Sequence, residues 1–355
     1  MKHLWCTLDV NHPVTVVGLD RNEILIVGLG SAGRRHLANL RALGWTDFRL
    51  LRTRRSTLPE GDLAGLPVAH DLDEALSRRP LAVVVSNPTA LHVPVALAAA
   101  RHGVHLFIEK PVSDQPDGLE SLEALVRTKN LVAMTGFQFR FNPGLLQLKA
   151  WIEGGAIGQV ISAQAHWGEY LPDMHPWEDH RTGNAARADL GGGVLLTLCH
   201  PFDYLRWIVG DVEAVTAMAG DVSYLPEFRG LDVDCAVDVL LRFTSGASGH
   251  VHLNFVQRPT QHRLVVIGTG GSVSWSQSDH AAHLNEARSG KTHTVPAPEG
   301  FERNSMFLDQ MRHFLACVRL EDQPRCTLND GLAALTVSLA AHKSLTEARH
   351  RVPCL

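Results

Sequence analysis

The chain has 355 residues, more than one hydrophobic core usually serves, so we expect two domains. Its hydrophobic content of 45%, charged content of 20% and net charge of −4 are typical of a globular protein and do not favour nucleic acid or an anionic membrane as a partner. No apolar run reaches the roughly 20 residues that cross a bilayer, and polar residues interrupt any signal-peptide core in residues 1–20. The six cysteines include no C-x-x-C pair, which favours reduced thiols and a cytoplasmic location.

Residues 22–44 give the first strong local signal. A buried strand over 24–27 runs into a glycine turn, and an amphipathic helix then extends to Gly44. The turn has the G-x-G-x-x-G spacing, in which the glycines allow a sharp turn, close approach of a pyrophosphate and close packing of helix on sheet. The helix N-terminus offers free N–H groups to an anion. We predict a dinucleotide site, with a plain packing turn as the alternative, at Gly28, Leu29, Gly30, Ser31, Ala32 and Gly33.

The second strand, predicted over 48–51, ends in a basic sequence. Sites that prefer NAD usually carry Asp or Glu here, about twenty residues after the glycines, to bind the ribose hydroxyls. This chain has Arg52-Thr53-Arg54-Arg55 instead. Arginines suit a 2′-phosphate, so we expect Arg52, Thr53 and Arg54 to favour NADP. The alternative interpretation is a solvated basic loop.

Helices and strands then alternate up to residue 135. We expect helices over 71–76, 93–102 and 118–129, and strands over 81–85, 104–108 and 132–135. This alternation predicts a right-handed, doubly wound parallel sheet of the Rossmann type. We assign it to residues 1–142, with 1–21 as an N-terminal extension that forms a short strand or a loose segment.

Residues 143–355 follow a different pattern. A helix over 145–152 is followed by segments of β type at 160–166, 212–219, 236–243, 247–255, 263–268 and 272–275. One helix, over 194–208, interrupts them, and two more close the chain at 306–318 and 330–349. We therefore predict an α+β second domain with a large, mostly antiparallel open sheet, whose terminal helix can pack back on the first domain.

Two residues are candidates for chemistry. Lys110 follows the strand 104–108, at the sheet edge where ligands bind in open α/β sheets, and the bond to Pro111 can be cis. His200 lies in the helix 194–208 near Asp203, and a histidine can exchange a proton near neutral pH. The alternatives are a surface ammonium group and a structural histidine.

Residues 167–181 are rich in aromatic and charged side chains. Aromatic rings stack on sugar faces and charged groups bond hydroxyls, so this composition is typical of a polyol-binding segment, although an ordinary exposed loop is the alternative. The substrate-binding residues that we select from it are Tyr170, His175, Trp177 and Arg181.

Four motifs occur in an order typical of one known family. They are Gly28 to His36, Ser86-Asn87-Pro88 with His92, Glu109-Lys110-Pro111, and Gly191-Gly192-Gly193 leading to His200 and Asp203. Together they resemble the glucose–fructose oxidoreductase and inositol dehydrogenase family (Gfo/Idh/MocA) over nearly the whole chain. The resemblance implies a Rossmann domain, a C-terminal domain whose open sheet is an oligomer interface, and catalytic roles for Lys110 and His200.

The resemblance also extends the expected site. Further cofactor-binding residues are Ser86, Asn87, Pro88, His92, Glu109, Lys110 and Gln138, and further substrate-binding residues are Arg140, Thr197 and Asp203. One departure matters. Many members carry Asp four residues before the catalytic histidine, whereas this chain has Leu196 followed by Thr197. Either Thr197 replaces the acid, or Asp203 or a loop residue supplements it, or Lys110 and His200 act alone.

These observations predict an NAD(P)-dependent dehydrogenase that acts on CH–OH and leans toward NADP. It would transfer a hydride between the nicotinamide and a ring hydroxyl or ketone of a sugar, a cyclitol or an amino sugar. The amino sugar would be free, linked to a nucleotide or part of an aminoglycoside. We expect a homodimer or homotetramer through the C-terminal sheet and no metal, since no ligand set has suitable spacing. The missing acid motivates the alternative of a catalytically inactive cofactor-binding regulator or scaffold.

Overall fold

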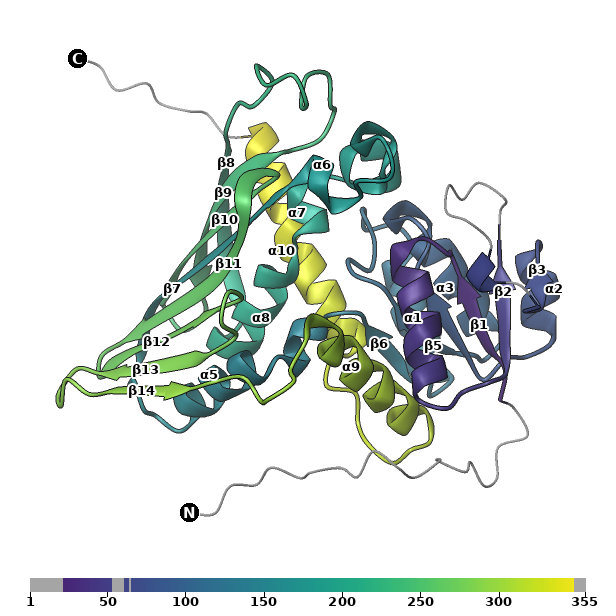
Figure 1. Cartoon of the computed structure of the whole chain (residues 1–355), viewed down its shortest axis with the longest axis horizontal. Coiled ribbons are helices and arrows are strands. Elements are labelled where there is room, and N and C mark those ends of the chain that lie inside the picture. The colour runs from purple at the N-terminus through teal and green to yellow at the C-terminus, as the bar shows by residue number, and fades with distance from the viewer. Residues whose placement is uncertain (1–21, 53–60, 64, 348–355) are drawn as a thin grey trace.

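The computed structural model describes residues 22–52, 61–63 and 65–347. Two sheets stand at opposite ends of the molecule, and helices α9 (Arg303–Val318) and α10 (Leu328–Glu347) lie between them (Figure 1). The first sheet has the strand order β3-β2-β1-β4-β5-β6, and the second has β14-β13-β12-β11-β7-β10-β9-β8. No helix in the described part of the chain is long and apolar enough to cross a bilayer.

The first sheet is parallel throughout and is flanked by helices, as the sequence predicts. Its strands are β1 (Ile24–Val27), β2 (Phe48–Leu51), β3 (Val68–Ala69), β4 (Ala82–Val85), β5 (His105–Ile108) and β6 (Ala133–Thr135). The helices of this part are α1 (Ser31–Ala42), α2 (Leu72–Ser77), α3 (His92–Arg101) and α4 (Leu119–Thr128). Every residue of β1 and β4 is buried, which is why these strands are wholly aliphatic. The strand order is that of dinucleotide-binding domains and reverses between β1 and β4.

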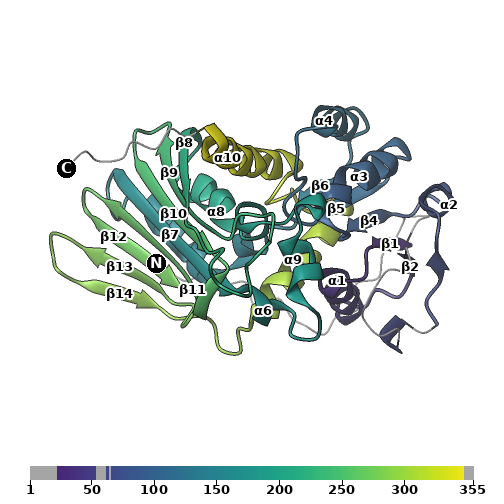
Figure 2. The same ribbon diagram turned by 90° about the horizontal axis from the view of Figure 1, so that it is seen from above.

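The second sheet is antiparallel except where β7 and β10 pair in parallel. Its strands are β7 (Val160–Tyr170), β8 (Val212–Ala219), β9 (Ala236–Phe243), β10 (Ser248–Asn254), β11 (Val256–Gly268), β12 (Gly271–Ser276), β13 (Ala282–Glu286) and β14 (Thr292–Val295). Helices α5 (Pro143–Glu153), α8 (His200–Val209) and α10 cover one face, and no described helix covers the other (Figure 2). Strand β9 alternates buried and exposed residues, as a sheet with one solvated face requires.

The predicted single helix over 194–208 is wrong, because the chain forms two helices there. Helix α7 ends at Thr197, and α8 starts at His200. The reason is Pro201, which has no N–H to donate to the carbonyl of Thr197 four residues earlier and so interrupts the helix. The predicted strand set also lacked β3, β13 and β14.

The terminal helix contacts both sheets. Its approach is fixed at β6, where the backbone N–H of Thr135 donates to the carbonyl of Cys326 at 3.1 Å. Gly331 packs so closely there that an added Cβ would lie 2.2 Å from the hydroxyl oxygen of Thr135. Near its other end, Ser344 Oγ accepts from the N–H of Ala217 in β8 at 2.9 Å. Helix α10 therefore fixes the orientation of one domain against the other.

Candidate active site

The glycine turn after β1 has the geometry that a dinucleotide needs. Gly28 has a φ of +87°, and an added Cβ at Gly33 would lie 1.9 Å from the carbonyl oxygen of Gly28. At Gly30, by contrast, an added Cβ would meet no atom of the described residues within 4 Å. The hydroxyl of Ser86 donates to the carbonyls of Val27 and Gly28 at 3.0 and 2.9 Å. The turn therefore packs tightly at Gly28 and Gly33, and it is open at Gly30, next to the first N–H groups of α1.

His92 connects the loops that follow β4 and β5. Its buried ring lies between two backbone carbonyls, with Nε2 2.9 Å from Asn87 O and Nδ1 2.8 Å from Pro111 O. Burial lowers the pKa of His92, and the two carbonyls partly oppose this shift. Beside it, the buried Oδ1 of Asn87 has no partner among the described residues. An unpaired buried acceptor next to an open glycine turn fits a bound dinucleotide that supplies a donor.

Glu109 and His36 form a second buried contact at this edge, with Glu109 Oε1 2.6 Å from His36 Nε2. The other carboxylate oxygen of Glu109 accepts from the backbone N–H of Lys110 at 3.1 Å. Burial alone would raise the pKa of Glu109, but the hydrogen bond and charge of His36, with the charge of Lys110, hold it below its usual value. We assigned no role to His36 from the sequence, although its place three residues after Gly33 puts it on the buried face of α1.

Lys110 reaches across to the second domain. Its Nζ donates to the backbone carbonyl of Thr197 at 2.7 Å, and the Lys110–Pro111 bond is cis, as the sequence allows. Thr197 O is the carbonyl that Pro201 leaves without a helical N–H donor. The helix break thus creates the acceptor that holds Lys110. Leu196, at the position where the resemblance implies an acid, is buried, and Thr197 contributes its backbone oxygen to this contact.

His200 begins α8 in an aromatic pocket. Its ring centroid lies 5.3 Å from Phe137, 4.9 Å from Phe139 and 5.3 Å from Trp167. The residue is 2% exposed, and its Nδ1 has no partner among the described residues. Burial first, and then the positive charge of Lys110, hold the pKa of His200 well below the usual histidine value. The imidazole is therefore neutral at neutral pH and can accept a proton.

A second buried histidine, His262 in β11, also contacts Trp167. The His262 and Trp167 rings are stacked 4.2 Å apart at 8°, and Tyr204 Oη lies 3.1 Å from His262 Nε2. Burial lowers the pKa of His262 to about 3. Sequence reasoning missed this residue. The available signal was its alternation with Leu264 and Val266, which places all three on the buried face of the strand.

The glycine run before α7 allows two close approaches. Gly193 has a φ of +96°, and an added Cβ there would lie 2.3 Å from Asp234 Oδ1. Asp234 caps α7, because its Oδ2 accepts from the N–H of Leu195 at 2.9 Å. Gly191 packs against the first domain, where an added Cβ would lie 2.8 Å from the Cβ of Thr89. Asp234, which the sequence did not single out, thus orients the short helix that presents Thr197 O to Lys110.

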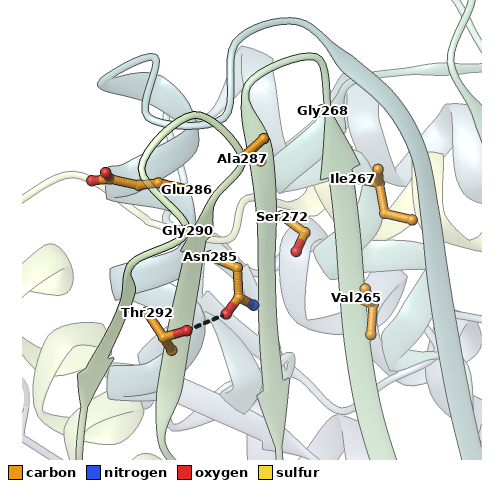
Figure 3. Close-up of a pocket in the computed structure, with 10 residues that line it drawn as sticks. Val265, Ile267, Gly268, Ser272, Asn285, Glu286, Ala287, Gly290 and Thr292 are labelled. Atoms are coloured by element: carbon orange, nitrogen blue, oxygen red, sulfur yellow. Dashed lines mark hydrogen bonds between the residues drawn. The ribbon is translucent and has the colours of Figure 1, made fainter.

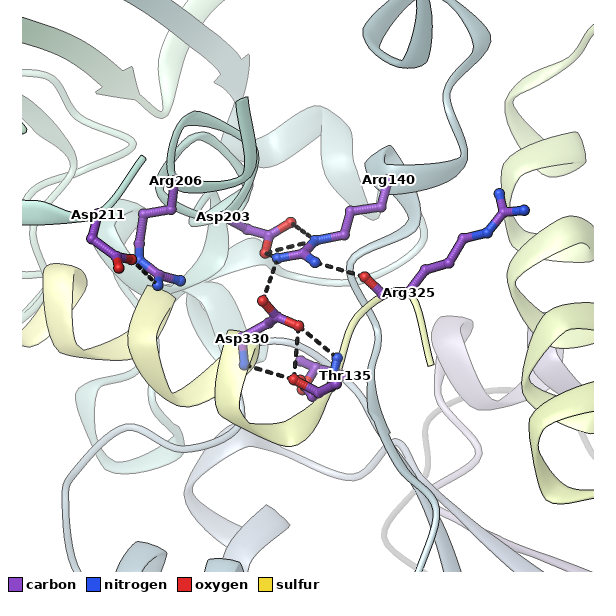
Figure 4. A network of polar contacts seen from close by, with 8 residues as sticks. Thr135, Arg140, Asp203, Arg206, Asp211, Arg325 and Asp330 are labelled. Carbon is purple, nitrogen blue, oxygen red and sulfur yellow. Dashed lines mark hydrogen bonds and ion pairs between the residues drawn. The ribbon is translucent and has the colours of Figure 1, made fainter. Parts of the chain in front are cut away.

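Arg140 and Asp203, which we expected at the substrate, form a buried ion pair instead (Figure 4). Arg140 Nε donates to both oxygens of Asp203 at 3.1 and 3.0 Å, and Nη2 donates to Asp203 Oδ1 at 2.7 Å. Nη2 also lies 3.1 Å from Asp330 Oδ1, and Nη1 donates to Arg325 O at 2.6 Å. Arg140 and Asp203 are 3% and 1% exposed. This geometry favours a structural role for both. Gln138, the first residue of the short helix 138–141, is also buried.

The segment expected to bind polyols extends from the end of β7. The Arg258 guanidinium lies 3.5 Å above the ring of Tyr170, and the His175 and Trp177 rings are 5.0 Å apart. Arg181 Nη2 donates to Pro226 O at 2.9 Å. Within the described part of the chain, none of the hydrogen bonds or ring contacts of these residues reaches Lys110 or His200. Trp177 is 56% exposed, so this segment can still contact the outer part of a large substrate.

Only Arg52 of the expected phosphate-binding residues lies within the described structure. It follows β2, its side chain is half-buried, and its carbonyl oxygen lies 3.0 Å from His70 Nδ1. Thr53 and Arg54 lie outside the described residues. No cluster of three or more metal-ligating side chains occurs among the residues that the structure describes.

One hollow of about 430 Å³ lies on the second sheet, away from this machinery. Val265 and Ile267 of β11 form one wall, and Ser272, Asn285 and Thr292 form the other (Figure 3). Thr292 Oγ1 donates to Asn285 Oδ1 at 2.8 Å. None of the residues predicted for the site lines this hollow, so we do not place the active site there.

The first part of the chain has a Rossmann sheet with an open glycine turn. Its lysine bonds across to a second part that carries a buried neutral histidine. These features define a two-domain nicotinamide-dependent oxidoreductase. Two family models match the chain. Residues 22–137 match the model described as an oxidoreductase family with an NAD-binding Rossmann fold, and residues 145–274 match the GFO/IDH/MocA C-terminal domain. The chain belongs to the Gfo/Idh/MocA family and is an NAD(P)-dependent dehydrogenase, as the sequence predicts.

Relatives agree with this membership, and a solved structure shares the fold. Myo-inositol 2-dehydrogenase of Thermotoga maritima is 28% identical over 349 residues, which cover 92% of this chain and 97% of that protein. Levoglucosan dehydrogenase of Pseudarthrobacter phenanthrenivorans is 30% identical over 220 residues, so that match spans about half of each chain (54%). A structure of levoglucosan dehydrogenase in complex with NADH and levoglucosan has a TM-score of 0.82 and 20% identity over 92% of this chain and 98% of that one, which shows a shared fold.

Proposed function

We propose that this enzyme transfers a hydride between the nicotinamide and a ring carbon of a sugar, an amino sugar or a cyclitol, interconverting a hydroxyl and a ketone. The observation that carries the proposal is the pairing of Lys110 with Thr197 O beside a buried histidine whose Nδ1 is unpaired. Two relatives are named for polyhydroxylated rings, inositol and levoglucosan, which supports a ring alcohol as the substrate class.

His200 and Lys110 have different roles in the proposed reaction. In the oxidative direction, neutral His200 takes the proton of the substrate hydroxyl, and general base help of this kind is worth roughly 10²–10⁴-fold in rate. The ammonium group of Lys110 has three donors, of which Thr197 O uses one. The remaining donors stabilise the substrate oxygen as negative charge develops on it. The bound nicotinamide supplies the hydride acceptor.

Replacement of the lysine tests this mechanism. We expect Lys110→Ala to bind NADH normally and to lose at least about 10²-fold in turnover, because the alkoxide loses its charged donor. Initial rates at 340 nm with a panel of sugars, and fluorescence titration with NADH, give the two readouts. Lys343→Ala is the matched control, since Lys343 on α10 is 71% exposed. Near-normal turnover by Lys110→Ala would remove this residue from the mechanism.

The buried Leu196 supports one alternative function. Without the acid that many members of the family carry at this position, the chain could bind the cofactor as a regulator or scaffold and perform no chemistry. A single-turnover experiment with bound oxidised cofactor and the same sugar panel separates the two functions. Growth of absorbance at 340 nm supports the enzyme, and its absence with every sugar supports the regulator.

The cofactor preference that we propose is NADP. Arg52 follows β2 at the place of the usual ribose-binding acid, and charge-assisted hydrogen bonds to a 2′-phosphate are worth about 1.5–3 kcal/mol each. We expect NADPH to bind at least about tenfold more tightly than NADH, and Arg52→Ala combined with Arg54→Ala to abolish the difference. Equal or tighter binding of NADH by the wild type contradicts this preference.

We also propose that the open face of the second sheet forms a homodimer or homotetramer interface. Four large apolar side chains are exposed on its strands, Ile161 (53%), Met218 (58%), Leu240 (58%) and Ile267 (39%). Exposed apolar side chains on a sheet that no described helix covers on one face are typical of a protein interface. We expect Leu240→Asp to lower the molar mass measured by light scattering, and an unchanged mass would count against this interface.

A further inference from the structure

Helix α9 of the C-terminal part packs directly on helix α1 of the Rossmann domain, as both views show (Figures 1 and 2). The side-chain amides of Asn39 and Asn304 bond each other in both directions, at 3.3 and 2.9 Å. The guanidinium carbon of Arg35 lies 4.3 Å from the ring centroid of Phe307. These contacts hold the first turn of α9 against the middle of α1.

This packing brings two arginines together. Arg303 starts α9, four residues before Phe307, so both lie on the same face of the helix. Arg35, which stacks on Phe307, is therefore a neighbour of Arg303. Within the described part of the chain, neither guanidinium has a hydrogen bond or an ion pair with a carboxylate. Burial, and then the charge of Arg303, lower the pKa of Arg35, which is the expected effect of two nearby like charges.

Packing and charge connect the two arginines to the proposed catalytic groups. Gln310 lies two turns along α9, and with its amide oxygen assigned to face Phe137 and Gln138 it accepts from their backbone N–H groups at 3.1 and 3.3 Å. Phe137 in turn contacts the ring of His200. The charge of Arg303 contributes to the lowered pKa of His200, and the charge of Glu109, the residue before Lys110, acts on Arg35. The charge interactions therefore link one guanidinium to each half of the proposed site.

Arg35 is half-buried and Arg303 is exposed, so neither is sealed from a ligand, and their planar donors match a carboxylate or a phosphate. We propose that Arg35 and Arg303 bind an anionic group of the substrate, so that this enzyme acts on an acidic sugar, one that carries a carboxylate or a phosphate. The proposal rests on the sugar oxidoreductase function proposed above. The pyrophosphate of the cofactor has its own donors at the first turn of α1, after Gly30.

Direct binding to the enzyme–NADH complex tests the pair. The ligands are glucose, glucuronate and glucose 1-phosphate, and the dissociation constants come from calorimetry. We expect glucuronate or glucose 1-phosphate to bind at least about tenfold more tightly than glucose, the factor that one charge-assisted contact supplies. The tighter of the two identifies the anionic group. Arg35→Gln and Arg303→Gln should each remove most of the preference, whereas Arg312→Gln, an exposed residue of the same helix, should retain it.

Equal binding of the neutral and anionic ligands, or a preference that survives both substitutions, overturns the arginine pair. A loss of NADH affinity in Arg303→Gln that matches the loss of anion affinity also overturns it, because the pair would then serve the cofactor. Turnover is measured separately. Anion-selective binding without cofactor reduction refutes hydride transfer and supports anion binding by Arg35 and Arg303. Equal oxidation of neutral and acidic sugars, unchanged in the two variants, refutes the pair and leaves hydride transfer standing.

Discussion

Asp203→Asn is the perturbation that best separates a structural role of the buried ion pair from a role in substrate binding. The substitution keeps the shape of the side chain and removes its charge. In the wild type, Asp203 is 1% exposed and accepts three hydrogen bonds from Arg140, at 2.7 to 3.1 Å. The asparagine leaves a buried guanidinium whose remaining partners are Asp330 and the carbonyl of Arg325.

The expected cost follows from these contacts. Removing one partner of a buried ion pair costs about 3–5 kcal/mol, because the other charge stays buried without compensation. Arg140 keeps Asp330 at 3.1 Å, and the Asp330 side chain is 31% exposed. We therefore expect the lower end of the range, about 3 kcal/mol in the free energy of unfolding, and about 1 kcal/mol or less for Asp330→Asn, in line with pairs that solvent reaches.

Urea denaturation followed by tryptophan fluorescence at pH 7.5 gives both values. If the pair is structural, the fraction of Asp203→Asn that stays folded has the KM of the wild type. A loss of less than about 1 kcal/mol, or a large rise in KM at unchanged stability, would refute the structural interpretation and restore the substrate-binding role that the sequence favoured.

Three further predictions follow from single contacts. Pro201→Ala supplies an N–H that competes for Thr197 O, so kcat should fall about tenfold as Lys110 loses a charge-assisted bond, while NADH affinity stays unchanged. His262 has a pKa of about 3 when folded and about 6.5 when unfolded, so the stability it contributes is full above pH 6.5 and decreases as the pH falls. Between pH 7.5 and 5, this histidine should lower the free energy of unfolding of the wild type by about 2 kcal/mol. Urea midpoints of His262→Gln should lack this part of the decrease with pH. Gly33→Ala drives a Cβ to 1.9 Å from a backbone oxygen, so titration should show NADH binding at least about tenfold weaker, and wild-type affinity would refute the tight turn.

The sequence by itself determined most of the Rossmann half. The four buried residues of β1 and of β4 are aliphatic, and the glycines after β1 have the conformation and close contacts that their spacing predicts. These signals work because they are local, since a strand, its turn and the next helix lie within about twenty residues. Pro201 was a local signal too, and it determines a helix break that the apolar pattern of 194–208 concealed.

Tertiary structure alone decided which charged side chains pair with each other and which have no carboxylate partner among the described residues. Arg140 and Asp203 are 63 residues apart and pair in the core, where the low dielectric requires a partner for each charge. Arg35 and Arg303 are brought together only because α9 packs on α1, and neither has an ion-pair partner within the described chain. Sequence patterns report whether a side chain suits a helix or a strand. They do not report which distant side chain it meets, because that depends on how whole elements pack.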